Sequence, residues 1–113
     1  MAKSNKPIFW SLFAAGGTLA AFLAPVLVLL FLLVSLGYTP DLFTYEKLHA
    51  FAAHWFGKLF LLAVITLFLW HAAHRLRVTL YDFGLRQDSV VAVVVYVTAA
   101  LGTILSVVYL LRI

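Results

Sequence analysis

Three long apolar runs dominate the sequence and restrict the fold more than any other feature. They extend over about residues 9–36, 57–74 and 90–111, and the third contains no charged side chain. An α-helix rises about 1.5 Å per residue, so roughly 20 apolar residues cross the hydrocarbon core of a bilayer. We therefore expect an all-α membrane protein with three transmembrane helices threaded up and down.

The composition of the chain is that of a membrane domain rather than a soluble one. Of the 113 residues, 65% are hydrophobic and 11% are charged, and the mean hydropathy is +1.10. A soluble domain is about 45–50% apolar and about 25% charged. We expect residues 1–113 to form a single membrane-anchor domain that works with partner subunits, because three short spans enclose little interior of their own.

Charge and cysteine usage narrow the possible partners and cofactors. The net charge is +4, and the basic residues are scattered at the ends of the apolar runs. Basic side chains at such positions extend to lipid headgroups, so we expect contact with membrane lipid and no binding of nucleic acid. The chain has no cysteine, so any iron–sulfur cluster or covalently attached haem would belong to a partner.

The distribution of basic residues also predicts the orientation, because cytoplasmic loops are enriched in lysine and arginine. With three spans, the N-terminal tail and the second connection lie on the same side of the membrane. Their basic residues are Lys3, Lys6, Arg75, Arg77 and Arg86. The basic residues of the opposite side are Lys47, Lys58 and Arg112. We therefore expect a cytoplasmic N-terminus.

Two connections separate the apolar runs. In the first, Gly37 can end a helix, and the Pro40-Asp41 pair suits the start of the next. The following stretch, Leu42–Trp55, is amphipathic, and the sequence leaves open whether it lies on the membrane surface or starts the second span. We expect the polar stretch Leu76–Ser89 to be the connection before the third span.

Small residues recur four positions apart in the first and third runs. Gly17 with Ala21 and Gly102 with Ser106 are two such pairs. Small side chains let helix backbones approach closely within a bilayer. We expect these two faces to pack against other helices, including those of a partner anchor subunit.

The polar groups best suited to bind a ligand meet at one membrane face. Trp10 begins the first span, and His74 and Arg75 end the second, so up-and-down threading puts all three on the same side. Phe13 lies one helical turn after Trp10 on the same face. An indole, an imidazole and a guanidinium at the boundary between hydrocarbon and water could hold a lipid-soluble molecule with a polar head.

Each of these residues also has a purely structural interpretation. Tryptophan is common at membrane interfaces, and an arginine there can simply mark the boundary. His71 and His74 lie three apart on one helical face, so one of them could ligate haem iron with a partner's histidine, or bind a headgroup or a quinone. The sequence shows no nucleophile–base pair, carboxylate pair or metal-ligand cluster, so we expect neither a free-standing enzyme nor a metal site.

Several short stretches together resemble a known family. They are Pro7-Ile8-Phe9-Trp10-Ser11-Leu12-Phe13-Ala14-Ala15-Gly16-Gly17, Ala24-Pro25, Tyr45-Glu46, Leu69-Trp70 and His74-Arg75. With the length and the three-span layout, they make the chain similar to the D subunit of fumarate reductase over essentially its whole length.

The resemblance implies a multi-pass anchor in a four-subunit complex of the bacterial inner membrane. A flavoprotein carrying FAD reduces fumarate, an iron–sulfur subunit relays electrons, and the D subunit pairs with the C subunit to bind menaquinone. In the family, the counterparts of Trp10, Phe13, His74 and Arg75 border this quinone. The anchor of the four-subunit form carries no haem, so the resemblance argues against haem here.

The sequence departs from the family just after the His74-Arg75 pair. Familiar members are rich in histidine there, whereas this chain has Arg77, Val78 and Tyr81. His71, in turn, stands where those members have a residue that is not a ligand. These departures leave anchoring unaffected but give no support to a proton path through the additional histidines.

We therefore expect a non-catalytic anchor subunit of quinol:fumarate reductase that helps to bind menaquinol, so that electrons pass through partner iron–sulfur clusters to fumarate. The nearest alternative is a haem-bearing anchor of succinate dehydrogenase, which a haem absorption band in the purified complex would reveal. A small transporter would need an ionisable residue near the centre of a span, and the three runs have none there. A pure assembly scaffold would leave the convergence of Trp10, His74 and Arg75 without a role.

Overall fold

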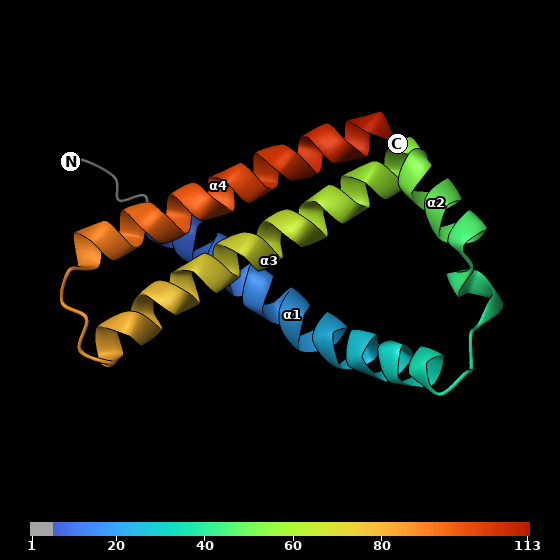
Figure 1. Cartoon of the computed structure of the whole chain (residues 1–113). Helices are drawn as coiled ribbons and strands as arrows, with labels where there is room; N and C mark the ends of the chain where they lie inside the picture. Colours follow the sequence, from blue (N-terminus) through green and yellow to red (C-terminus); the bar gives the residue numbers. More distant parts are fainter. Residues whose placement is uncertain (1–5) are drawn as a thin grey trace.

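Helices make up the fold in a computed structural model that describes residues 6–113 (Figure 1). In chain order they are α1 (Lys6–Ser35), the short 3-10 helix η1 (Asp41–Phe43), α2 (Tyr45–Ala53), α3 (Trp55–Asp82) and α4 (Asp88–Arg112). The described residues contain no β-strand, which confirms the expected all-α class. Lys3, one of the residues used to predict the orientation, lies outside this range.

Three of the helices are long and apolar enough to cross a membrane. Their spanning stretches are Trp10–Ser35, Trp55–Asp82 and Asp88–Arg112. This confirms the expected three transmembrane helices. Large apolar side chains along α1, such as Phe22 and Phe31, are exposed. Exposed apolar surface of this extent suits contact with lipid or with partner subunits rather than with water.

Helix α1 ends just before Gly37, the glycine that the sequence predicted as a helix end. Gly37 has a φ of 93°, in the left-handed region that glycine adopts without a steric cost. The N–H of Tyr38 donates to the carbonyl of Leu33 at 2.9 Å. This bond is part of the Schellman pattern that satisfies the last carbonyls of a helix, and it confirms the break expected at residue 37.

The segment between the first two spans forms a helix of its own. His54 separates α2 from α3 with an extended backbone (ψ 142°), and its Nδ1 accepts a hydrogen bond from the Phe56 N–H at 3.1 Å. Gly57 allows the sharp junction, because a Cβ there would overlap the backbone carbonyl of Phe51. Residues 45–53 are therefore not a continuation of the second span, a choice that the sequence had left open.

The helix α3 continues further than the sequence predicted. The stretch Leu76–Ser89 was expected to be a connection, but α3 runs to Asp82 and α4 begins at Asp88. Leu80 packs against the buried cluster between the two helices, which favours another turn of helix. The stop comes at Gly84, whose φ is 99°. The true connection is therefore only about residues 83–87, and the prediction of a longer one is wrong.

The most extensive packing lies between α3 and α4, which run side by side in Figure 1. The buried residues of this contact are Ala73, Val91, Val95 and Ala99. A Cβ placed on Gly102 would lie 3.0 Å from a Leu69 methyl group, so α4 also approaches α3 closely there. The small-residue face of the third span therefore packs against a helix of the same chain.

In the second contact α1 crosses α3, passing behind it in the view of Figure 1. Gly16 is buried, and a Cβ on it would lie 2.7 Å from the Leu67 carbonyl oxygen. A Cβ on Gly17 would lie 2.9 Å from Cε1 of His71. The adjacent glycines thus bring the α1 backbone against α3, so this face too packs within the chain. The crossing fixes where the start of α1 meets the second half of α3.

Candidate functional site

The α1–α3 crossing brings Phe13 against two histidines of α3. The Phe13 ring stacks on the His71 ring with centroids 4.5 Å apart and meets the His74 ring edge-on at 4.6 Å. His71 is also held by a hydrogen bond between its Nδ1 and the Phe13 carbonyl oxygen at 3.2 Å. Because a carbonyl oxygen can only accept, this nitrogen carries the hydrogen. His71 therefore serves to join the two helices, a role that the sequence did not determine.

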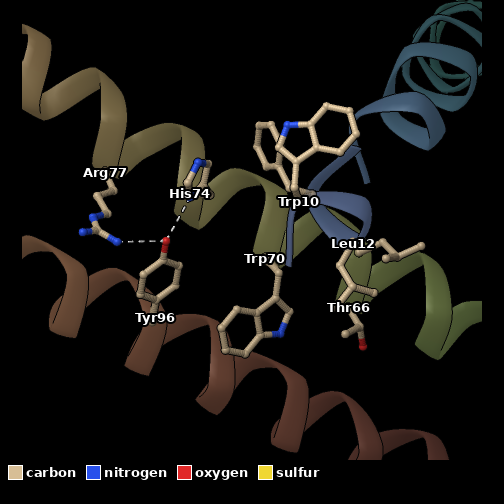
Figure 2. A pocket seen from close by; sticks show the side chains of 9 residues that line it. Trp10, Leu12, Thr66, Trp70, His74, Arg77 and Tyr96 are labelled. Carbon is tan, nitrogen blue, oxygen red and sulfur yellow. Dashed lines mark hydrogen bonds between the residues drawn. The ribbon is translucent and has the colours of Figure 1, made fainter. Parts of the chain in front are cut away.

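A pocket of about 900 Å³ opens beside this contact, between α1, α3 and α4 (Figure 2). Its volume lies in the range of about 300–1,000 Å³ that is typical of small-molecule sites. Its lining residues are Trp10, Leu12, Phe13, Thr66, Leu67, Trp70, His74, Arg77 and Tyr96. The walls are mostly aromatic and aliphatic, and three of the polar side chains, His74, Arg77 and Tyr96, meet at one end, away from Thr66.

These polar side chains form one hydrogen-bonded chain across the α3–α4 interface. The Tyr96 hydroxyl lies 3.0 Å from Nδ1 of His74 and 3.4 Å from Nη1 of Arg77, as Figure 2 shows. Arg77 in turn donates to both carboxylate oxygens of Asp88, from Nε at 2.9 Å and from Nη2 at 2.6 Å. This paired geometry holds the guanidinium plane more firmly than a single contact would.

The Tyr96 ring is held in place from the other side by Trp70. The two rings are stacked with centroids 5.9 Å apart. The Trp70 indole N–H donates to Oγ1 of Thr103 at 3.2 Å, and that hydroxyl donates to the Ala99 carbonyl at 2.8 Å. Trp70 thus contributes an apolar wall to the pocket, while its polar atom is already used within the chain.

The structure brings together three of the four residues predicted as the site. Trp10, Phe13 and His74 all line the pocket, although Trp10 is 69% exposed. Arg75 is exposed and is not among the lining residues. Successive helical residues point about 100° apart, so Arg75 lies on another face of α3 than His74. Any role of Arg75 at the pocket would involve a ligand that extends beyond it, and the assignment stays a prediction.

Sequence reasoning missed several lining residues. Trp70 was noted only as part of the Leu69-Trp70 motif, Arg77 was placed in a connection, and Tyr96 was one unremarked residue of the third apolar run. Tyr96 could have been identified as a candidate, because a phenolic hydroxyl within a membrane span needs a hydrogen-bond partner. For Arg77 the signal was Gly84, which marks the end of α3 seven residues later and so keeps Arg77 on the helix.

The pocket can hold a flat, lipid-soluble ring against aromatic walls and offer hydrogen bonds at one end. Among the described residues, no group of three or more histidine, cysteine, aspartate or glutamate side chains could hold a metal ion. Arg77, which lines the pocket, is paired with the carboxylate of Asp88. The aromatic walls and the hydrogen-bonding groups at one end suit the binding of such a ligand.

Comparison with known proteins matches this architecture to one family. The model of the family described as the D subunit of fumarate reductase matches residues 1–111. The fumarate reductase D subunit of Aliivibrio salmonicida is 36% identical to this chain, and that of Aliivibrio fischeri is 37% identical; both alignments cover 98% of this chain and 94% of the relative. The D subunit of a Shewanella species is 37% identical over 97% of this chain and 93% of its own length.

The matches cover both the spanning helices and the pocket, and they confirm the resemblance that the motifs around Trp10 and His74 indicated. They extend over nearly the full length of each relative, so they apply to the whole anchor rather than to one helix. With its three membrane-spanning helices, this chain is a multi-pass membrane protein that belongs to the family of fumarate reductase D subunits.

Proposed function

We propose that the chain is a non-catalytic membrane anchor of fumarate reductase, and that the pocket between α1, α3 and α4 helps to bind menaquinol. The observation that carries the proposal is the convergence of Trp10, Phe13 and His74, from distant parts of the sequence, on one apolar pocket. Family membership supports the anchor role, and the pocket supports the ligand, because a naphthoquinol is a flat aromatic ring with two polar oxygens.

The proposed partners supply what this chain lacks. A flavoprotein with FAD reduces fumarate, an iron–sulfur subunit relays electrons to it, and the C subunit of fumarate reductase completes the anchor. Oxidation of menaquinol releases two electrons to the iron–sulfur clusters and two protons. This chain binds and orients the ring, and fixed donors near its oxygens favour the negative charge that develops as the protons leave.

His74 and Arg75 are the polar groups that we assign to this task, with Trp10 and Phe13 as aromatic contacts. His74 lies in the pocket, within 4.6 Å of the Phe13 ring. Arg75 follows it on the exposed face of α3, where it can reach a quinol shared with partner subunits. His71 is packed between Phe13 and Gly17, which favours a structural role over haem ligation and supports a quinone site without haem.

Binding can be tested directly by photolabelling. An azido-substituted naphthoquinol, irradiated in membranes that contain the assembled complex, should label peptides with Trp10–Phe13 or with Thr66–Arg77, because both stretches line the pocket. Peptide mapping by mass spectrometry identifies the sites, and excess menaquinol analogue should suppress them. Labelling confined to α2, or labelling that excess analogue leaves unchanged, would contradict the proposed site.

We further propose that the N-terminus and the pocket lie on the cytoplasmic side of the inner membrane. Basic residues are more numerous at this end, and the site must face an iron–sulfur protein in the cytoplasm. Reporter fusions made after Asp41, Gln87 and Ile113 should then read outside, inside and outside. A reading that puts Asp41 and Gln87 on the same side would contradict the three-span topology.

A further inference from the structure

The hydrogen bonds between Arg77, Tyr96 and His74 beside the pocket favour one direction, and that direction sets which nitrogen of His74 carries a hydrogen. Arginine has donors only, so in the Arg77 contact the Tyr96 oxygen is the acceptor. The phenol has one hydrogen of its own, and among the residues that the structure describes its other hydrogen-bonding neighbour is Nδ1 of His74, at 3.0 Å. A chain in which every group is satisfied therefore runs from Arg77 to Tyr96 to His74, with Nδ1 as the final acceptor.

This direction also decides whether the second ring nitrogen of His74, Nε2, carries a hydrogen. A neutral imidazole has one N–H and one bare nitrogen, and the hydrogen bond at one position decides the state of the other. When Nδ1 accepts from Tyr96, Nε2 carries the hydrogen. His74 then presents an N–H donor and no acceptor to a molecule in the pocket.

Two further contacts restrain the side chains of this hydrogen-bonded series. Asp88 binds Arg77 through both of its oxygens, which leaves Nη1 free for Tyr96. Trp70 stacks on the Tyr96 ring and limits its rotation. All four hydrogen-bonded residues lie on α3 and α4, the two helices with the most extensive contact, and Phe13 of α1 adds an edge-on contact with the His74 ring.

We propose that Tyr96, held by Arg77 and Asp88, is a positioning residue that locks His74 as an Nε2–H donor toward the quinol oxygen. The inference rests on the proposed menaquinol site and adds a role within it. His74 is on this view a donor that stabilises negative charge on the quinol oxygen, and it does not take the proton that the quinol releases. A preset donor needs no reorganisation when charge develops.

The test is a double-mutant cycle in the assembled complex. Tyr96→Phe removes only the hydroxyl, and the ratio of menaquinol-linked to dye-linked fumarate reduction should fall about threefold to tenfold, as expected for one neutral hydrogen bond. In a His74→Leu background, Tyr96→Phe should cause no further fall, because Tyr96 acts through His74. Tyr109→Phe, which changes an exposed tyrosine elsewhere on α4, is the matched control and should leave the ratio unchanged.

The outcomes separate the two claims. If His74→Leu lowers the ratio but Tyr96→Phe leaves it unchanged, the positioning role is wrong and the quinol site stands. If Tyr96→Phe lowers the ratio equally in both backgrounds, Tyr96 acts independently of His74 and the inference is also overturned. If His74→Leu itself leaves the ratio unchanged, the quinol site fails.

A second variant tests whether His74 is a donor. His74→Gln keeps an N–H donor without an imidazole and should recover part of the activity lost in His74→Leu. If His74→Gln is as inactive as His74→Leu while both complexes assemble, His74 acts through a property that only imidazole has, and the donor assignment is wrong.

Discussion

Replacing Gly16 with leucine should release fumarate reductase from the membrane. A Cβ at this position would lie 2.7 Å from the backbone carbonyl oxygen of Leu67 and 3.0 Å from Cβ of His71. Backbone cannot move aside as a side-chain end can, so the helices must separate. Overpacking of this kind costs about 1–3 kcal/mol even where neighbours can adjust. Because α1 meets α3 at this crossing, its loss should disrupt the pocket as well as the fold.

The measurement is the fraction of fumarate reductase activity that stays with the membranes, assayed with a soluble dye that bypasses the quinol. We expect that fraction to fall by more than half in Gly16→Leu, with dye-linked activity retained in the soluble fraction. Ala15→Leu adds a side chain of the same size at an exposed neighbouring position and should leave attachment near normal. Equal attachment in both variants would show that the crossing is not needed for assembly.

Replacing His74 with leucine should slow menaquinol-linked fumarate reduction about tenfold or more. A hydrogen bond to a charged group contributes about 1.5–3 kcal/mol, and roughly 1.4 kcal/mol corresponds to a factor of ten in rate. Arg75→Leu should have a comparable effect if Arg75 reaches the quinol, and Arg75→Lys should recover only part of it, because lysine lacks the planar guanidinium fork. A normal rate in Arg75→Leu beside a slow His74→Leu would make Arg75 a boundary charge only.

The sequence was sufficient to predict which helix ends meet. Trp10 and His74 follow from span order alone, because consecutive spans alternate in direction and the ends of neighbouring runs must face the same side. Phe13 follows from helical periodicity, one turn after Trp10. These inferences need only the length of a span and the pitch of a helix, and neither depends on how the helices rotate against one another.

The rotation of α3 against α4 could not be predicted, and it decides the rest of the pocket. The line of small and branched residues Val91, Val95 and Ala99 faces α3, which places Tyr96 beside the seam and in contact with His74. The small residues Gly102 and Ser106 indicated a packing face of the third run, but not which helix it would meet or which residues of α3 would lie opposite it. The same uncertainty about helix rotation applies to Arg75. It follows His74 directly on α3, and a shift of one residue is enough to point its side chain away from the pocket.

The polar residues after His74 were misread for a different reason. Arginine and aspartate in a stretch that follows an apolar run suggest a loop, yet Arg77 and Asp88 pair across two helices at 2.6 Å. Each charge has its partner on the other helix, so neither polar residue interrupts its helix. A charged residue at the end of a span is therefore compatible with helix wherever its counter-ion lies on the neighbouring helix.

The ratio of menaquinol-linked to dye-linked fumarate reduction in His74→Leu complex tests the central claim most directly. The ratio cancels differences in the amount of complex and in the partner flavoprotein and iron–sulfur subunits, so it reports the quinol site alone. His49→Leu removes an exposed histidine on α2, outside the pocket, and serves as the matched control. We predict a ratio about tenfold lower in His74→Leu and unchanged in His49→Leu. An unchanged ratio in both would contradict a menaquinol site in this pocket.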